Sequence, residues 1–287
     1  MAIVLGANQY GKAEVRLLHV RRDDTADMIT DLNVSVALSG ELAAVHLTGD
    51  NSAVLATDTQ KNTVFALARE HGVGQIEDFA LLLARHFVAA QPAISFARVT
   101  VEQYPWDRLA GHSFVRSGRE VRTATVSHDG THSWVVSGVG GLTVLNTAGS
   151  EFWGFARDRY TTLAETTDRI LATAVSARWR HASAEASAGC WADSYRAARD
   201  LLLEAFAGTH SYSLQQTLYA MGARVLEGRP EIAEVRLALP NKHHFEVDMS
   251  PFGLENAGEV FYAADRPYGL IEGTVNRDDA PPPGRAW

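Results

Sequence analysis

Hydrophobic and polar residues alternate along two early segments of the chain, which is typical of strands with one buried face. Two stretches with apolar residues at helical spacing follow, and two further alternating segments complete the first half. The predicted order of strand, strand, helix, helix, strand, strand occupies 13–22, 30–41, about 59–70, 76–91, 94–104 and 120–128. In the second helix, one apolar face is formed by Ile76, Phe79, Leu83 and Phe87. The polar run 23–27 predicts a turn between the first two strands.

The second half of the chain shows the same order of patterns. Strands are predicted at 132–146, about 174–181, 231–249 and 269–276, and helices at 193–208 and 214–227. Because an antiparallel sheet needs cover on one face, the repeated order predicts an α+β fold of two domains, each with an antiparallel sheet and a helix pair. We assign residues 1–130 to the first domain and 131–278 to the second. The composition of 279–287 predicts a disordered tail.

The strand pattern at 231–249 is interrupted by four polar residues, 241–244. Side chains alternate between the faces of a strand, and the apolar residues on both sides of the interruption share the odd positions. Asn241 and His243 therefore fall on the apolar face, about 7 Å apart. Lys242 and His244 fall on the solvated face, so the adjacent histidines point apart and cannot chelate one ion together. Asn241 and His243 are either a hydrogen-bonded core pair or the polar lining of a pocket.

Two helix starts fit the capping box, in which a hydroxyl residue is followed three positions later by Gln. They are 57–60 and 213–216. If Ser213 and Gln216 close such a box, Gln215 is left free in the first helical turn. A helix N-terminus offers unpaired N–H groups and a partial positive charge, which suit a flat anionic ligand. Ordinary capping without a ligand is the simpler interpretation of both starts.

Composition and charge exclude several classes of protein. The chain of 287 residues is 46% hydrophobic and 21% charged, with a formal net charge of −8. The negative charge argues against a nucleic-acid binder, and no apolar stretch is long enough for a membrane span. The N-terminus lacks the features of a secretory signal, and the C-terminal residues lack the peroxisomal address. With the single cysteine, Cys190, these features predict a cytoplasmic protein.

Common catalytic motifs are not found in the sequence. The glycine-rich segment 138–145 resembles a phosphate loop only loosely and precedes a strand, so it reads as a turn. The G-x-S-x-G, H-E-x-x-H and C-x-x-C patterns are missing. His128 and His132 are four residues apart, but in a predicted hairpin turn. A zinc site built from scattered histidines stays an alternative that no spacing supports.

Four separated motifs resemble the urate oxidase (uricase) family, most closely its actinobacterial form. They are VLATDTQKNTV (54–64), GLTVLNTAGSEFWGFARDRYTTLAETTDRILAT (141–173), SLQQTLY (213–219) and LPNKHHFEVD (239–248). The resemblance runs from residue 8 to residue 275. It implies two tandem ββααββ units of the tunnelling fold, assembled as a homotetramer around a central tunnel. It also implies oxidation of urate by O₂ and water to 5-hydroxyisourate and H₂O₂, with neither a metal nor an organic cofactor.

The resemblance further implies which residues bind the purine. Phe152 would stack on the ring, since aromatic faces suit a planar ligand. Arg169 and Gln215 would bind the edges of urate through a guanidinium fork and an amide. Leu163 and Leu214 would form apolar walls, with the Leu214 backbone N–H as a further donor. Leu214 stands where some relatives have valine, so the resemblance does not fix the width of the pocket.

The remaining implied residues concern oxygen and protons. Lys12 and Thr57 match the catalytic dyad of the family, and His243 matches the third member of its proton relay. Thr57 and Asn241 would hold O₂, water or peroxide above the ring. In the family, Lys12, Thr57 and the backbone of Asp58 come from one subunit and the purine-binding residues from its neighbour. The resemblance therefore implies a site that only assembly completes.

Two other functions remain as alternatives. One is a zinc-dependent enzyme of the same fold that acts on a pterin or purine, which needs a set of histidine or cysteine ligands. The other is an inactive purine-binding homologue. The presence of Lys12, Thr57 and His243 argues against the inactive homologue.

Overall fold

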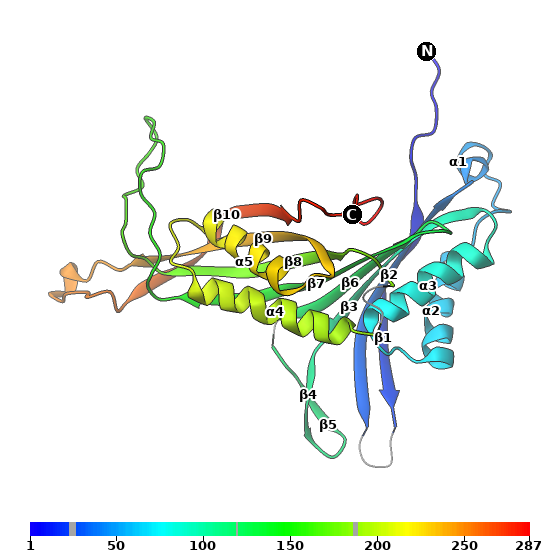
Figure 1. The fold of residues 1–287 in the computed structure, drawn as a ribbon, viewed down its shortest axis with the longest axis horizontal. Coiled ribbons are helices and arrows are strands. Elements are labelled where there is room, and N and C mark those ends of the chain that lie inside the picture. The colour runs from blue at the N-terminus through cyan, green and yellow to red at the C-terminus, as the bar shows by residue number, and fades with distance from the viewer. Residues whose placement is uncertain (23–26, 119, 186–188) are drawn as a thin grey trace.

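The structure of the chain is a computed structural model that describes residues 1–22, 27–118, 120–185 and 189–287 (Figure 1). The elements of the first half are β1 (Tyr10–Arg21), β2 (Met28–Gly40), α1 (Ala43–Thr48), α2 (Thr57–His71), α3 (Ile76–Ala90), β3 (Ile94–Tyr104), β4 (Trp106–Ala110), β5 (Ser113–Arg116) and β6 (Val121–His128). Those of the second half are β7 (Ser133–Asn146), β8 (Leu171–His181), α4 (Trp191–Gly208), α5 (Leu214–Gly228), β9 (Ile232–Glu246), the 3₁₀ turn η1 (Ser250–Phe252) and β10 (Phe261–Asn276).

The predicted order ββααββ is confirmed in each half, with three kinds of difference. The short helix α1 and the β4–β5 hairpin were not predicted, and β8 and β10 begin earlier than their alternation indicates. Strand β9 ends at Glu246 rather than at residue 249. Of the predicted turn at 23–27, residues 23–26 lie outside the described part of the chain.

The main strands form one antiparallel sheet in the order β1-β2-β3-β6-β7-β8-β9-β10. The two halves join where β6 pairs with β7, and the predicted domain boundary at residue 130 falls in the turn between these strands. Helices α2 and α3 pack on the first four strands, and α4 and α5 pack on the last four (Figure 1). The register places both helix pairs on the same face of the sheet. Strands β1 and β10 are the two ends of the sheet.

Each half has its own hydrophobic core under its helix pair. The predicted apolar face of α3 is confirmed, because its members are at most 2% exposed: Ile76, Phe79, Leu83 and Phe87. In the second half, the odd positions of β8 and β9 pack against α4 and α5, among them Val175, Trp179, Val235 and Leu239. Burial of one strand face and one helix stripe is what the period-two and helical patterns predict.

A buried polar cluster fixes the first half to the second. The Glu77 carboxylate of α3 accepts hydrogen bonds from Arg122 of β6 (2.6 Å) and from Ser137 of β7 (2.7 Å). The Ser137 hydroxyl also lies 3.0 Å from Nε2 of His181 on β8. Burial raises the pKa of Glu77 and lowers the pKa of His181 to about 4. His181 is therefore neutral at pH 7, and the cluster resembles a buried ion pair surrounded by hydrogen bonds.

The segment 279–287 does not match the disorder that its composition predicts. It lies on the face of the sheet opposite the helices, where Arg98 donates hydrogen bonds to the backbone oxygens of Arg285 (3.0 Å) and Trp287 (2.6 Å). The guanidinium of Arg236 lies 3.8 Å from the centre of the Trp287 ring. Ala286 is 2% exposed. Arginine side chains on this face supply donors and cation–π contacts that composition alone does not show.

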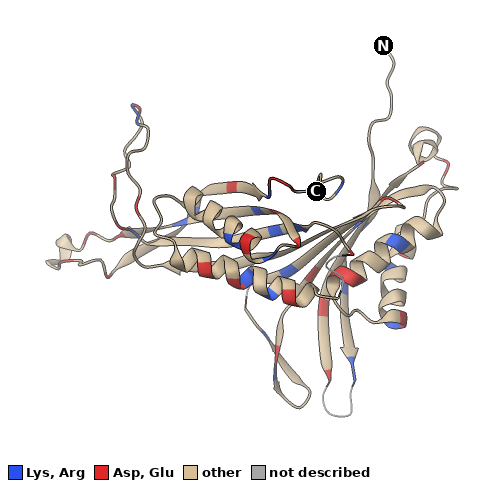
Figure 2. Cartoon of the chain, viewed as in Figure 1, with Lys and Arg blue, Asp and Glu red and all other residues tan. Residues whose placement is uncertain are grey.

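The distribution of charged residues on the surface agrees with the net negative charge of the chain. Acidic and basic residues are interspersed along α4 rather than separated into a basic face (Figure 2). Among the described helices, none is long and apolar enough to span a bilayer.

Candidate functional site

A cavity of about 520 Å³ lies in the second half, between the end of β9, the neighbouring strand β10, the start of α5 and the long connection from β7 to β8. It brings together the predicted residues Phe152, Leu163, Arg169, Leu214, Gln215, Asn241 and His243. The other residues of its wall are Ala164, Thr166, Asp168, Ile170, His244, Phe245, Glu246, Phe261 and Ile271. A largely apolar pocket with a few convergent polar groups is typical of a small-molecule site.

Backbone hydrogen bonds hold Phe152 in the cavity wall. Its N–H donates to the carbonyl of Thr166 (2.8 Å), and the Thr166 N–H donates back to Phe152 (3.0 Å). The neighbouring Glu151 N–H donates to the carbonyl of Ser211 (2.7 Å), just before α5. The Phe152 ring stacks on Phe155 with centroids 5.0 Å apart and planes inclined by 13°. The aromatic wall is thus held from two sides and presents a flat surface to a planar ligand.

Arg169 carries an unused donor beside this ring. Its guanidinium carbon lies 5.1 Å from the centre of the Phe152 ring. Its Nε is buried, and no described residue accepts a hydrogen bond from it. Burial lowers the pKa of Arg169, although a guanidinium stays charged at neutral pH. A partly desolvated cation with a free N–H suits an anionic edge of a flat ligand.

The start of α5 confirms Ser213 as the N-cap, while the Gln216 side chain bonds the residue before the cap rather than the cap itself. The Ser213 hydroxyl accepts a hydrogen bond from the Gln216 N–H (3.2 Å), and the Gln216 side-chain oxygen accepts one from the Tyr212 N–H (2.8 Å). Gln215 takes no part in the cap and lines the cavity beside the buried Leu214. The free amide predicted for the first turn is therefore available to a ligand.

The second capping box, at 57–60, is wrong. Helix α2 begins at Thr57 itself, and Ala56 occupies the N-cap position without a side-chain hydrogen bond. Gln60 instead donates through Nε2 to the carbonyl of Leu55 (3.1 Å). Because Thr57 lies inside the first turn, its exposed hydroxyl does not cap the helix.

Asn241 and His243 line the cavity, which favours the pocket interpretation over a core pair. The odd positions of β9 are buried as far as Leu239, but Phe245 is 52% exposed, so the apolar face opens onto the cavity beyond that point. His244 also lines the cavity, although alternation places it on the solvated face. The β9–β10 register shifts between Ala264 and Gly269, and such an irregularity re-aims the neighbouring side chains.

The protonation of His243 follows from its surroundings. Burial lowers its pKa, and the charges of Arg169 and His244 lower it further. The imidazole is therefore neutral at pH 7 and can accept a proton.

Lys12, Thr57 and Asp58 form a separate group in the first half and do not line this cavity. Asp58 has a lowered pKa, mainly from its hydrogen bond with Lys61, and the charge of Lys12 contributes as well. The Leu55 N–H donates to the Tyr10 hydroxyl (3.0 Å), which ties β1 to the segment that leads into α2. Within one chain, the predicted site residues thus form two groups.

The backbone of β1 is irregular beside Lys12. The register with β2 shifts between Lys12 and Val15, and Glu14 has a φ of 58°, a left-handed conformation that is rare outside glycine. The Glu14 N–H donates to the Ser35 hydroxyl (3.0 Å). At Gly11 an added Cβ would lie 1.8 Å from the carbonyl oxygen of Val36, so only glycine fits there. Bulges of this kind occur next to active sites and set the direction of a side chain.

Sequence reasoning missed several residues of the cavity wall. Thr166 and Asp168 lie three residues and one residue before Arg169, and the Asp168 carboxylate accepts a hydrogen bond from the Gly149 N–H (2.8 Å). The run of polar residues that contains Thr166 and Asp168 could have indicated that they belong to the site. Phe261 and Ile271 reach the cavity through the pairing of β10 with β9, for which the sequence carries no local signal.

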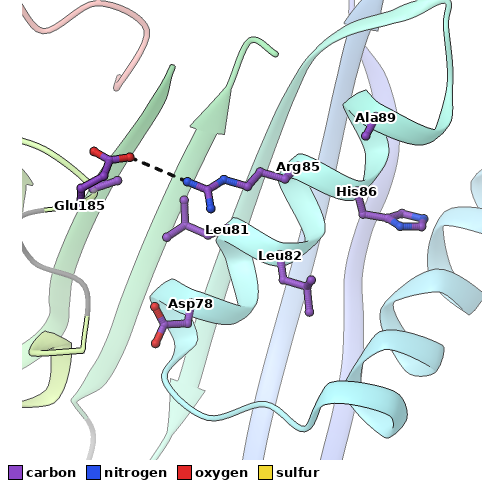
Figure 3. A pocket seen from close by; sticks show the side chains of 8 residues that line it. Asp78, Leu81, Leu82, Arg85, His86, Ala89 and Glu185 are labelled. Carbon is purple, nitrogen blue, oxygen red and sulfur yellow. Dashed lines mark ion pairs between the residues drawn. The ribbon is translucent and has the colours of Figure 1, made fainter. Parts of the chain in front are cut away.

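Other possible sites give no comparable arrangement. A hollow of about 550 Å³ lies on the outer face of α3, with the Arg85–Glu185 ion pair (3.9 Å) at its edge (Figure 3). None of the predicted site residues lines it. Within the described part of the chain, no group of three or more His, Cys, Asp or Glu side chains could hold a metal ion. The zinc alternative therefore lacks a donor set there.

The charge of Arg169 near His243 generates a prediction. Removing it in Arg169→Gln should raise the pKa of His243, because one cause of the lowered value is lost while burial remains. NMR titration of the His243 ring protons measures this pKa. The exposed Arg157 gives a matched control, since Arg157→Gln should leave the pKa of His243 unchanged. An unaltered titration in Arg169→Gln would contradict the assigned electrostatics.

Comparison with known proteins agrees with this arrangement. The family model described as Uricase matches residues 8–127 and 135–272. The uricase of Arthrobacter globiformis is 54% identical over 96% of this chain and 91% of its own length. The uricase of Emericella nidulans is 39% identical over 95% of this chain and 97% of its own. The crystal structure of the Arthrobacter globiformis uricase superposes with a TM-score of 0.94, at 52% identity and with 98% of each chain covered. The chain belongs to the uricase family.

Proposed function

We propose that the protein oxidises urate with O₂ and water to 5-hydroxyisourate and H₂O₂, using neither a metal nor an organic cofactor. The observation that carries this proposal is the single cavity in which a flat aromatic wall, a partly desolvated cation and a neutral histidine meet. Membership of the uricase family supports the same reaction. The zinc-dependent and inactive alternatives are not favoured.

The purine would bind against the second-half group of residues. Its ring stacks on Phe152, and its anionic edge receives the Arg169 fork and the Gln215 amide. Leu163 and Leu214 exclude water from the two sides of the ring. The free Nε of Arg169 gains an acceptor in this arrangement, which offsets the cost of leaving it unpaired.

The oxidation of urate needs proton transfer both before and after the transfer of electrons to O₂. Urate gives up protons and two electrons, O₂ takes the electrons, water adds a hydroxyl at C5 of the purine, and O₂ leaves as H₂O₂. Lys12 acts as the base through the Thr57 hydroxyl, which the helix does not use. The neutral imidazole of His243 accepts and returns protons of the relay. Thr57 and Asn241 hold O₂, water or peroxide above the ring.

The two groups of residues would meet between subunits. Strands β1 and β10 end the sheet, and an exposed edge is a ready template for pairing with another chain. Apolar side chains are exposed on both, including Leu18 (58%) on β1 and Tyr262 (64%) and Leu270 (53%) on β10. Pairing of β10 with β1 of a second copy would bring Lys12 toward His243. The assembly in this proposal is a homotetramer of tandem tunnelling-fold domains around a central tunnel, in the cytoplasm.

The direct test is an assay of the purified protein. After treatment with a chelator, the protein receives urate in air while urate absorbance and peroxide are followed together. We expect loss of urate with a matching amount of peroxide. Activity that returns only on addition of zinc would support the zinc-dependent alternative, and analogue binding without turnover would support the inactive homologue.

The proton relay gives a second prediction. Lys12→Met and Thr57→Ala should each lower kcat by about two orders of magnitude or more, because a positioned acid–base group contributes that much. Binding of a purine analogue should be largely kept, because the purine-binding residues are untouched. Thr59→Ala changes an exposed threonine of the same helical turn and should leave kcat unchanged. Full activity in either relay variant would refute the assignment.

A further inference from the structure

Asp168 lies next to Arg169 in the cavity wall, but its carboxylate does not serve that cation. A carboxylate close to a guanidinium would raise the pKa of the cation. Burial lowers the pKa of Arg169, and no described carboxylate raises it in return. The Asp168 carboxylate instead accepts a hydrogen bond from the N–H of Gly149 (2.8 Å). It is therefore bound to the backbone, and the charge of Arg169 is left for a ligand.

The turn that precedes Arg169 is held at both of its ends. The Thr166 hydroxyl donates to the carbonyl of Asp168 (2.6 Å) and accepts the Asp168 N–H (3.3 Å). The backbone of Thr166 pairs with that of Phe152 through two hydrogen bonds (2.8 and 3.0 Å). The Asp168 side chain fastens the other end of the turn to Gly149. Arg169 follows directly, so these bonds set the place from which its side chain starts.

Gly149 is itself tied to the start of α5. Its carbonyl accepts the N–H of Ser211 (3.0 Å), and the Ser211 hydroxyl donates to the carbonyl of Ser213, the N-cap of the helix (3.0 Å). Gly149 has a φ of 76°, a left-handed conformation that glycine adopts without strain. The Asp168 anchor therefore connects the turn before Arg169 with the start of α5.

We propose that Asp168 is a positioning residue whose carboxylate holds Arg169 in register with Phe152 and Gln215. This inference rests on the proposed function, in which the ring of urate stacks on Phe152 while Arg169 and Gln215 bind its edges. Gln215 lies in the first turn of α5, to which the anchor leads. An arginine side chain loses much rotamer freedom when it is fixed, so a mobile starting point weakens its grip on a ligand. Asp168 acts through Arg169 and need not touch urate.

Kinetics of variants that lose or keep the anchor test this role. In Asp168→Ala, KM for urate should rise about three- to tenfold, the range for loss of one hydrogen bond. The value of kcat should stay within about twofold, because the proton relay is untouched. Asp168→Asn keeps an oxygen that accepts the Gly149 N–H, and its KM should stay near that of the unsubstituted protein.

Asp158 of the same connection gives a matched control. Its carboxylate also accepts a backbone hydrogen bond, from the Tyr160 N–H (2.9 Å), but it is not part of the cavity wall. Asp158→Ala should therefore leave KM unchanged. A rise in KM as large as that in Asp168→Ala would mean that any loosened turn of the connection has this effect, and would overturn the specific role of Asp168.

The pKa of His243 provides a readout that does not depend on turnover. The charge of Arg169 lowers this pKa. A guanidinium that is no longer held beside the cavity lowers it less, so the pKa should rise in Asp168→Ala, by no more than in Arg169→Gln. Loss of the Asp168 charge acts in the opposite direction, because an anion nearby favours the charged imidazole. Asp168→Asn, which loses the charge and keeps the anchor, should show no rise.

A double substitution shows whether Asp168 acts through Arg169. When Arg169→Gln is already present, Asp168→Ala should not raise the pKa of His243 further. A further rise would overturn the inference. So would an unchanged KM or an unchanged pKa of His243 in Asp168→Ala, or a KM in Asp168→Asn as high as that in Asp168→Ala.

Failure of this inference and failure of the proposed function give different results. If the pKa of His243 shifts as expected in the variants while the unsubstituted protein oxidises no urate, the proposed function is contradicted and the positioning of Arg169 stands. If urate is oxidised and the pKa of His243 is the same in Asp168→Ala, the positioning role is wrong and the function stands.

Discussion

The antiparallel ladder between β6 and β7 is the constraint on which the rest of the structure depends. It joins two ββααββ halves into one sheet with both helix pairs on the same face, and it leaves β1 and β10 as the two free ends. Lys12 lies on one end strand, while Asn241 and His243 lie on β9 beside the other. The fold of one chain therefore separates the two groups of residues that the proposed reaction needs together, and in the proposed assembly pairing of the free edges between copies would bring them together.

The second-half cavity shows how a stable frame supports unpaired polar groups. Backbone pairs hold Phe152 to Thr166, and hydrogen bonds of the Ser213 and Gln216 side chains fix the start of α5. Within this frame, the Nε of Arg169 and the hydroxyl of Thr173 are buried without partners among the described residues. Natural sequences break the rule of satisfied buried groups mainly at functional sites. The proposed function gives the Arg169 Nε such a partner, a bound anion.

Local patterns predicted the elements well, and long-range pairing accounts for most of what they missed. The apolar face of α3, and the alternation of apolar and polar residues along β9 up to Leu239, follow directly from burial of one face of each element. The Thr57 capping box failed because helix α2 begins one residue earlier than the pattern indicates, with Ala56 at the N-cap position. The position of His244 depends on a register shift in β10, and the order of 279–287 depends on Arg98 and Arg236 from distant strands. Strand alternation singled out Asn241 and His243, whereas Arg169 and Phe152 were identified from the resemblance, since spacing alone leaves Arg169 a surface charge and Phe152 a core residue.

The central claim is that one site draws on two copies of the chain, and reassembly of two inactive variants tests it most directly. Lys12→Met and Arg169→Gln would be co-expressed and their urate turnover compared with that of each variant alone. A site shared between subunits predicts recovery to about a quarter of wild-type activity, because random assembly pairs an intact Lys12 with an intact Arg169 in about one site in four. Activity that stays at the level of the separate variants would mean that each chain carries its own complete site, and would contradict the account.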